Sequence, residues 1–213
     1  MKIELRTVGA FQENCYLVID PATRRCVIVD PGAEPEQLIA MVRASGATLD
    51  AIWLTHAHID HIGAIAHVKS TWDVPIFLHP EDRPLYDRGA MQAAVYGLPF
   101  EQPPAPERDL AEGDRLTVGS VTFDVIHVPG HAPGHVAFVG DGQMLGGDLL
   151  FAGSIGRTDL PLSDPDRMVE SLERIATLPD ETIVHPGHGP ATTIGRERAT
   201  NPFFTGHARV VRR

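Results

Sequence analysis

The sequence is poor in cysteine and in basic residues. Its 213 residues include only two cysteines, Cys15 and Cys26, and these do not form a Cys-x-x-Cys pair. A disulfide framework or a cysteine-based zinc site is therefore excluded, and we expect both thiols to be buried and reduced. The 18 basic residues face 28 acidic ones, which gives a formal net charge of −10. Proteins that bind nucleic-acid backbones usually carry a basic excess, so we expect no nucleic-acid partner.

Long hydrophobic runs are also missing. No stretch of the sequence approaches the roughly 18 uncharged apolar residues that would span a bilayer. The N-terminal segment is interrupted by Glu4, Arg6 and Glu13, unlike a secretory signal. We therefore expect a cytoplasmic protein without a membrane partner. The length and the hydrophobic fraction of 43% predict one globular domain over residues 1–213.

Short apolar runs alternate with helical patterns along the chain. Strands are predicted at 15–19, 26–29, 51–54, 75–78, 121–128, 136–139, 144–145 and 182–184, and helices at 35–45, 61–70, 88–95 and 166–178. Apart from the short helix at 88–95, the proline-rich segment 80–108 has no regular pattern, and we interpret it as a surface excursion that could border a site. Two successive groups of strands, each followed by a helix, predict a layered α/β domain with two related halves.

Histidine is the abundant residue, with 11 in the chain, and the densest cluster is the run THAHIDH at 55–61. This run lies between a predicted strand and a predicted helix. Side chains two apart in an extended segment point the same way, so His56 and His58 can converge on one ion. The turn into the helix then redirects Asp60 and His61. These four side chains predict a site for one or two divalent metals.

Three more potential ligands follow predicted strands. His131 lies in the run VPGH, Asp148 in LGGD and His188 in HPGHG, each beside glycines that let the backbone approach a crowded centre. Ligands delivered from several strand ends into one crevice are typical of sites in layered α/β folds. Two ions that share a bridging ligand could be held by the combined set, which consists of His56, His58, Asp60, His61, His131, Asp148 and His188.

The other histidines lack ligand spacing or lie beside better-placed ligands. We interpret four of them as surface or core residues, namely His67, His79, His127 and His207. His135 and His185 lie close to predicted ligands in the sequence, so either could hydrogen-bond around the metals, but we do not expect them to bind metal directly.

These motifs resemble those of the metallo-β-lactamase superfamily. The family's HxHxDH motif corresponds to THAHIDH, its third histidine motif to VPGHAPGH, its bridging aspartate to GGDLLF and its last histidine to HPGHGP, in the same order. The resemblance implies an α/β fold of the αββα sandwich type, in which two mixed sheets are flanked by helices. Zinc is the expected metal, with iron or manganese as alternatives, because all three accept histidine and aspartate ligands.

The resemblance also assigns the ligands to two metals. It implies that the first metal is bound by His56, His58 and His131. It implies that the second metal is bound by Asp60, His61 and His188. Asp148 would bridge the two metals.

Within the superfamily the sequence is most similar to the glyoxalase II (hydroxyacylglutathione hydrolase) branch, in particular its short single-domain bacterial members. The runs GSIGRTD at 153–159 and TTIGRERATNPF at 192–203 carry this similarity. It implies hydrolysis of a small-molecule thioester of the S-lactoylglutathione type through a metal-bound hydroxide. Asp60 and Asp148 would be catalytic, and Arg157 would contact the substrate.

Two features depart from that branch. We expect no C-terminal helical domain for glutathione, because the chain stops at Arg213. The family's two glutathione-contacting tyrosines fall at Asp159 and Pro190. The metal chemistry therefore rests on more matching residues than the glutathione specificity does.

Other functions of the same fold stay open. A mononuclear iron enzyme like the persulfide dioxygenases, which also carry a GRTD run, would use His56, His131 and Asp148. A lactonase or another ester hydrolase, and a metal-binding module without activity, are further alternatives. A thioesterase is favoured because its leaving thiol has an ordinary pKa of about 8.5 and needs little protonation. The sequence does not predict an oligomeric state.

Overall fold

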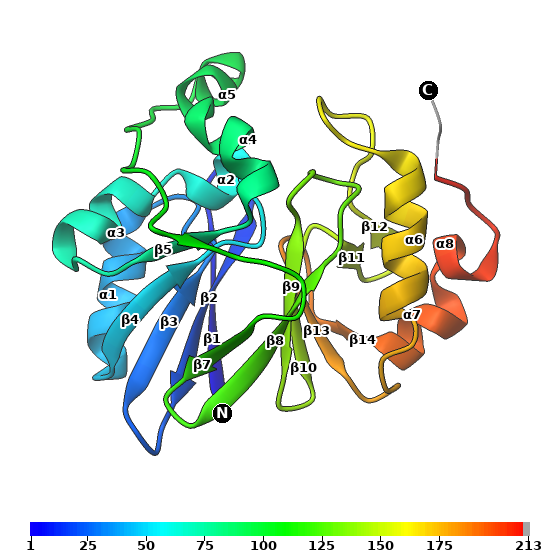
Figure 1. Ribbon diagram of the computed structural model, residues 1–213, viewed down its shortest axis with the longest axis horizontal. Coiled ribbons are helices and arrows are strands. Elements are labelled where there is room, and N and C mark those ends of the chain that lie inside the picture. Colours follow the sequence, from blue (N-terminus) through cyan, green and yellow to red (C-terminus); the bar gives the residue numbers. More distant parts are fainter. Residues whose placement is uncertain (211–213) are drawn as a thin grey trace.

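Two six-stranded sheets lie face to face in the computed structural model, which describes residues 1–210, and helices cover their outer surfaces (Figure 1). The strands of the first sheet follow chain order: β1 (Lys2–Val8), β2 (Glu13–Asp20), β3 (Arg25–Val29), β4 (Thr48–Trp53), β5 (Ile76–Leu78) and β6 (Arg108–Asp109). β1, β2 and β3 pair antiparallel, whereas β3 to β6 pair parallel. The first sheet is therefore mixed, as the sequence predicts.

The second sheet has a different connectivity. In spatial order it contains β14 (Thr192–Thr193), β13 (Ile183–Pro186), β10 (Gln143–Gly147), β9 (Val136–Gly140), β8 (Val121–His127) and β7 (Arg115–Val118). Its pairs are antiparallel except for β10 with β13, which is parallel. A separate small hairpin is formed by β11 (Leu150–Phe151) and β12 (Ser154–Ile155). The predicted αββα sandwich is thus confirmed.

Helices flank both sheets. The first sheet is covered by α1 (Pro35–Ser45), α2 (Ile59–Ile62) and α3 (Ile65–Thr71), and the second by α6 (Pro165–Ile175), α7 (Ile194–Thr200) and α8 (Pro202–Thr205). The excursion at 80–108 contains a 3₁₀ turn (Pro80–Asp82), α4 (Arg83–Asp87) and α5 (Gly89–Tyr96). Within the part of the chain described, no helix combines the length and apolar character needed to cross a membrane.

The two-residue period of the strands creates the layers. In β2, Tyr16 and Val18 face the second sheet, whereas Cys15 and Leu17 pack in the cluster that includes Leu38 of α1. Both faces of β2 are therefore covered, and the whole strand is buried. Cys15 and Cys26 are free and buried, as the sequence predicts.

The helix predicted at 61–70 is divided in the structure, and this division shapes the site. The backbone N–H of Ala64 donates to the carbonyl of Pro31 at 2.9 Å instead of continuing the helical ladder. Gly63 lies so close to the carbonyl of Gly32 that a Cβ atom would stand 2.4 Å from that oxygen. Contacts with the β3–α1 loop therefore separate α2 from α3, which local periodicity does not predict.

Aromatic packing between the sheets yields a stability prediction. The buried ring of Trp53 lies 5.6 Å from the ring of Phe123 and 5.1 Å from that of Phe138. We expect Trp53→Ala to lower the free energy of unfolding by about 3–5 kcal/mol, because it opens a cavity between the sheets. The other tryptophan, half-buried Trp72 under Arg43, is the control, and Trp72→Ala should cost about 1 kcal/mol. Urea unfolding followed by circular dichroism measures both, and equal losses would contradict the prediction.

Candidate metal centre

The structure brings the predicted ligand motifs together beyond the ends of four strands. The run 55–61 follows β4, the loop with His131 follows β8, Asp148 follows β10 and His188 follows β13. Pairing of β10 with β13 places Gly147 opposite Pro186, so the last two motifs leave the second sheet side by side. Strands from both sheets therefore contribute to one centre.

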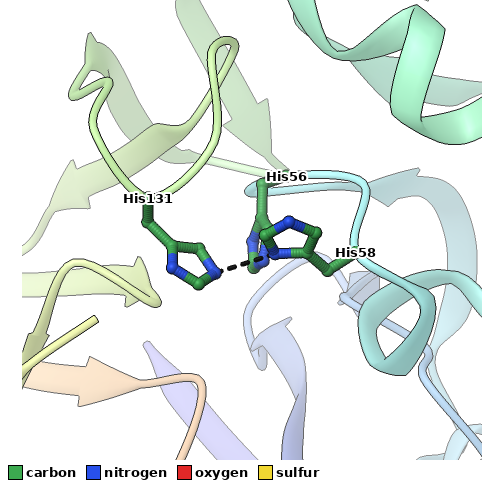
Figure 2. Close-up of side chains that lie close together, drawn as sticks. All are labelled: His56, His58 and His131. Carbon is green, nitrogen blue, oxygen red and sulfur yellow. Dashed lines mark hydrogen bonds between the residues drawn. The ribbon is translucent and has the colours of Figure 1, made fainter. Parts of the chain in front are cut away.

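The first cluster contains three histidines. His58 Nδ1 and His131 Nε2 lie only 2.8 Å apart, and the ring of His56 stands beside them (Figure 2). The ring centroid of His56 is 4.8 Å from that of His58 and 4.9 Å from that of His131. One nitrogen of each ring lies within 4.8 Å of the others, as a shared ion requires.

The second cluster combines an aspartate and two histidines. His188 Nε2 lies 3.2 Å from Asp60 Oδ2, and His61 Nε2 lies 4.0 Å from the same oxygen. These three residues also form a group whose potential ligand atoms lie within 4.8 Å of one another. The structure therefore joins the residues of both predicted metal positions.

Asp148 stands between the two clusters. Its Oδ1 lies 3.5 Å from His61 Nε2, and its Oδ2 lies 3.5 Å from both His131 Nε2 and His188 Nε2. The carboxylate thus borders one histidine of the first cluster and two of the second. This is the position that a bridging ligand needs.

Backbone carbonyls fix the tautomers of two histidines. His131 Nδ1 donates to the carbonyl of Arg157 at 2.8 Å, and His188 Nδ1 donates to the carbonyl of Phe11 at 3.1 Å. A carbonyl oxygen only accepts, so Nδ1 carries the proton and Nε2 presents its lone pair to the centre. Metal-binding histidines typically donate their other ring N–H in this way.

The carboxylate of Asp30 has the same role for His61 and, through Thr55, for His56. Asp30 Oδ2 accepts from His61 Nδ1 at 3.0 Å and from the hydroxyl of Thr55 at 2.6 Å. Thr55 Oγ1 in turn lies 3.1 Å from His56 Nδ1, from which it can accept a hydrogen bond. Asp30 therefore orients one histidine of each cluster. Its signal in the sequence is an aspartate directly after the predicted strand at 26–29, in VDPG, a pattern that by itself marks only the end of a strand.

Several buried atoms at the centre have no hydrogen-bond partner among residues 1–210. They include His56 Nε2, His61 Nε2 and Asp148 Oδ1. Each buried polar atom left unpaired costs about 1–3 kcal/mol. Divalent cations in the two clusters would satisfy all three, and the histidine and aspartate donors suit zinc, iron or manganese. The residues present therefore fit a metal centre.

In the first cluster, burial favours the neutral histidines that a metal requires. Burial, reinforced by His61, holds the pKa of His56 well below its usual value, and burial together with His131 lowers the pKa of His58 to about 3. Both rings are therefore neutral, which is the form that binds metal. Burial alone would raise the pKa of Asp148, but neighbouring His61, His131 and His188 together lower it and keep this carboxyl ionised.

Asp82 connects two ligand loops and was missed in the sequence, where it lies in the irregular segment. Its Oδ2 accepts from the N–H of Ala57 at 2.8 Å, and its Oδ1 accepts from the N–H of Gly134 at 2.6 Å. Burial raises the pKa of Asp82 to about 6, against the lowering effect of the two N–H groups. The carboxylate thus ties the loop of His56 and His58 to the loop that follows His131.

Asn14 positions the loop of His188 and was also missed. Its Nδ2 donates to the carbonyls of Pro186 at 3.1 Å and Gly189 at 2.7 Å. Tyr16 adds a hydrogen bond of 2.7 Å from its hydroxyl to the carbonyl of Pro186. Strand β2 of the first sheet thereby holds a ligand loop of the second.

The Arg157 side chain points away from the ligands. Its guanidinium donates to Asp159 at 2.8 and 3.0 Å and is largely exposed. Only its carbonyl reaches the centre, through His131. The expected contact of Arg157 with substrate therefore stays a prediction.

Six histidines lie outside the two clusters, and two of them, His67 and His207, are exposed as expected. His135 is buried with its ring centroid 4.9 Å from that of His56, without a hydrogen bond among the described residues. His185 instead bonds Gln143 at 2.7 Å. His79 and His127 stack at 4.1 Å outside the centre.

Comparisons with known proteins agree with this geometry. Residues 8–188 match the Metallo-beta-lactamase superfamily. The chain is 38% identical over 209 residues to hydroxyacylglutathione hydrolase GloC of Haemophilus influenzae, covering 96% of this chain and 98% of that protein.

Two solved structures are also similar. One is TTHA1623 in a di-iron-bound form, at 50% identity and a TM-score of 0.88 over 94% of this chain and 99% of that one. The other is BLEG-1 B3 metallo-beta-lactamase, at 38% identity and a TM-score of 0.90 over 96% and 100%.

Metal content tests the second cluster. We expect His188→Ala to lower the bound metal from about two ions per chain to about one, because the second cluster loses one of its ligands. His185→Gln is the matched control, since His185 lies three residues away and faces Gln143, and it should keep both ions. Elemental analysis after dialysis measures the content. Equal metal content in the two variants would contradict the assignment of His188.

The role of Asp82 yields a further prediction. Asp82→Ala leaves two buried N–H groups unpaired, so we expect a loss of about 2–5 kcal/mol in the free energy of unfolding. We also expect metal affinity to fall about 10- to 100-fold, because the ligand loops lose their link. Asp82→Asn, which keeps one acceptor, should lie between, and exposed Asp87→Ala should change neither quantity. Unchanged metal affinity in Asp82→Ala, measured by chelator competition, would make the residue purely structural.

Proposed function

The chain belongs to the metallo-beta-lactamase superfamily and is a metal-dependent hydrolase, and from that premise we propose that it hydrolyses acyl thioesters at a centre for two divalent metals. The proposed substrate is a small molecule of the S-lactoylglutathione type. Similarity to hydroxyacylglutathione hydrolase GloC supports this choice. The two free and buried cysteines suit a reducing compartment such as the cytoplasm, where we place the protein.

The observation that carries the proposal is the position of Asp148. Its two oxygens lie 3.5 Å from Nε2 atoms of both histidine clusters, so one carboxylate serves both metal positions. A mononuclear iron enzyme needs only His56, His131 and Asp148. It would leave the second cluster around Asp60 without a role, and this favours the binuclear hydrolase.

The chemistry divides between the metals and the protein. Divalent ions bound there would lower the pKa of water and polarise a carbonyl. The carboxylates of Asp60 and Asp148 face the space between the clusters, where they can orient a water and accept its proton. The water oxygen joins the acyl carbon and the carbon–sulfur bond breaks. The sulfur leaves as a thiolate that takes a proton, and the other product is a carboxylic acid.

The leaving group explains why a thioester suits this centre. A thiol has an ordinary pKa of about 8.5, so its thiolate departs without an acid to protonate it. An amide nitrogen would require a proton donor. Arg157 is the proposed substrate contact, because its guanidinium is exposed and its own backbone carbonyl accepts from His131 at the centre. Zinc is the proposed metal, with iron as the alternative that the di-iron form of TTHA1623 supports.

Hydrolysis assays on the metal-loaded protein test the function. We expect release of free thiol from S-lactoylglutathione, loss of activity after chelation, and recovery on adding zinc or iron. Asp148→Asn should lower kcat at least about a hundredfold, because the shared ligand and proton acceptor is lost. Asp141→Asn, in the exposed β9–β10 turn, is the matched control and should keep full activity. Metal content is measured on the same samples.

Two outcomes would contradict the proposal. One is oxygen uptake with glutathione persulfide, one bound iron and no thiol release, which would indicate a dioxygenase. The other is cleavage of lactones with no cleavage of thioesters.

A further inference from the structure

A cavity of about 510 Å³ lies beside the second ligand cluster. We call it the Phe11 cavity, and four segments line it. They are the β1–β2 turn (Val8, Gly9, Ala10, Phe11), the β3–α1 loop (Gly32, Ala33, Glu34, Pro35), helices α2 and α3 with the turn between them (Ile59, Asp60, Gly63, His67), and the segment after α5 (Leu98, Pro99, Phe100, Glu101). Its volume lies within the range of about 300–1,000 Å³ that is usual for small-molecule sites.

The walls of the Phe11 cavity are mainly apolar. Hydrocarbon surface comes from Val8, Phe11, Ile59, Leu98 and Phe100. Among the described lining residues there is no lysine or arginine, and the charged members Glu34, Asp60 and Glu101 are acidic. Carboxylates or phosphates entering this space would meet negative charge, whereas an alkyl group would be removed from water.

The cavity shares two residues with the metal centre. Asp60 lines it and also lies 3.2 Å from His188 Nε2. Phe11, in the β1–β2 turn, also lines the cavity, and its backbone carbonyl accepts from His188 Nδ1 at 3.1 Å. The Phe11 cavity therefore adjoins the second ligand cluster at Asp60 and Phe11.

The excursion after β5 closes one side of the cavity. The rings of Phe11 and Tyr96 meet edge to face, with centroids 5.0 Å apart. Phe100 packs against Gly89, where a Cβ atom would stand 2.4 Å from the Phe100 ring. Helix α5 is thus tied both to the β1–β2 turn and to the segment 98–101, so the wall is fixed by packing on two sides.

We propose that the Phe11 cavity holds the acyl chain of the substrate and that this chain is an unbranched hydrocarbon of several carbons. The inference rests on the thioester hydrolysis proposed above, but it replaces the lactoyl group of the proposed substrate by a longer apolar acyl group. A lactoyl group is short and hydroxylated, so it would leave most of the apolar wall uncovered. The thiol-bearing half of the substrate would then lie on the opposite side of the centre, away from the acidic residues.

A series of thioesters with one uncharged thiol carrier tests the inference. We use acetyl, butanoyl, hexanoyl and octanoyl thioesters of N-acetylcysteamine, together with the lactoyl thioester. We expect kcat/KM to rise about fourfold for each added methylene, which corresponds to about 0.8 kcal/mol. Hexanoyl should therefore exceed acetyl by about two orders of magnitude.

Variants locate the effect in the cavity. Leu98→Glu places a charge in the apolar wall and should abolish the dependence of kcat/KM on chain length. Pro99→Glu changes an exposed lining residue and keeps the test available if Leu98→Glu does not fold. Val95→Glu is the matched control, because Val95 is 75% exposed on α5 outside the cavity, and it should behave like the parent protein.

Direct binding separates this inference from the proposed function. Calorimetry with octanamide and acetamide on the metal-free protein should detect only octanamide, and Leu98→Glu should abolish its binding. Equal hydrolysis of all chain lengths, or a preference for lactoyl, would overturn the inference and leave the thioesterase function standing. If no thioester is cleaved, the proposed function fails, and octanamide binding alone decides whether the cavity accepts alkyl chains.

Discussion

The buried carboxylate of Asp30 is the interaction on which both ligand clusters depend. It accepts from the backbone N–H and the hydroxyl of Thr55 and from His61 Nδ1, and through Thr55 it also orients His56. Asp30 has a positive φ of 51°, a backbone conformation that residues other than glycine rarely adopt. Such strain persists only where surrounding contacts hold it, and three hydrogen bonds do so here. The residue after β3 is thus held in place by its hydrogen bonds to Thr55 and His61.

The two sheets depend on each other in the same way. The side chains of Asn14 and Tyr16, in β2 of the first sheet, donate to the loop of His188, which follows a strand of the second sheet. The carbonyl of Thr55 accepts from the N–H of Val136 at 2.8 Å, which joins β9 to the loop after β4. The centre therefore lies at the joint between the sheets. Movement of one sheet against the other would separate the clusters, so the aromatic packing between the sheets also maintains the geometry of the site.

The sequence predicts what local patterns determine. Period-two strands, the helix at 35–45 and the dense run at 55–61 all follow from neighbouring residues. Contacts between segments that are distant in the sequence cannot be predicted from such local patterns. The break after α2 comes from Pro31 accepting the N–H of Ala64, and Asp82 finds its partners in Ala57 and Gly134 only once the chain has folded. The clustering of the seven predicted side chains could be foreseen because they follow strand ends in recognisable motifs, whereas the residues that orient them carry no such pattern.

Buried charge links metal binding to folding. The carboxylates of Asp30, Asp60 and Asp148 surround the imidazoles of the centre. Burial lowers the pKa of His56 and His58, so these two rings stay neutral. The carboxylates therefore bring negative charge into a region with little water. Buried charges without partners are costly, and cations in both clusters would remove that cost. Since the unfolded chain cannot gather these side chains, binding energy for the ions becomes folding energy. The same seven side chains, as metal ligands, would suit several hydrolytic reactions of this fold, so the walls around them must select the substrate.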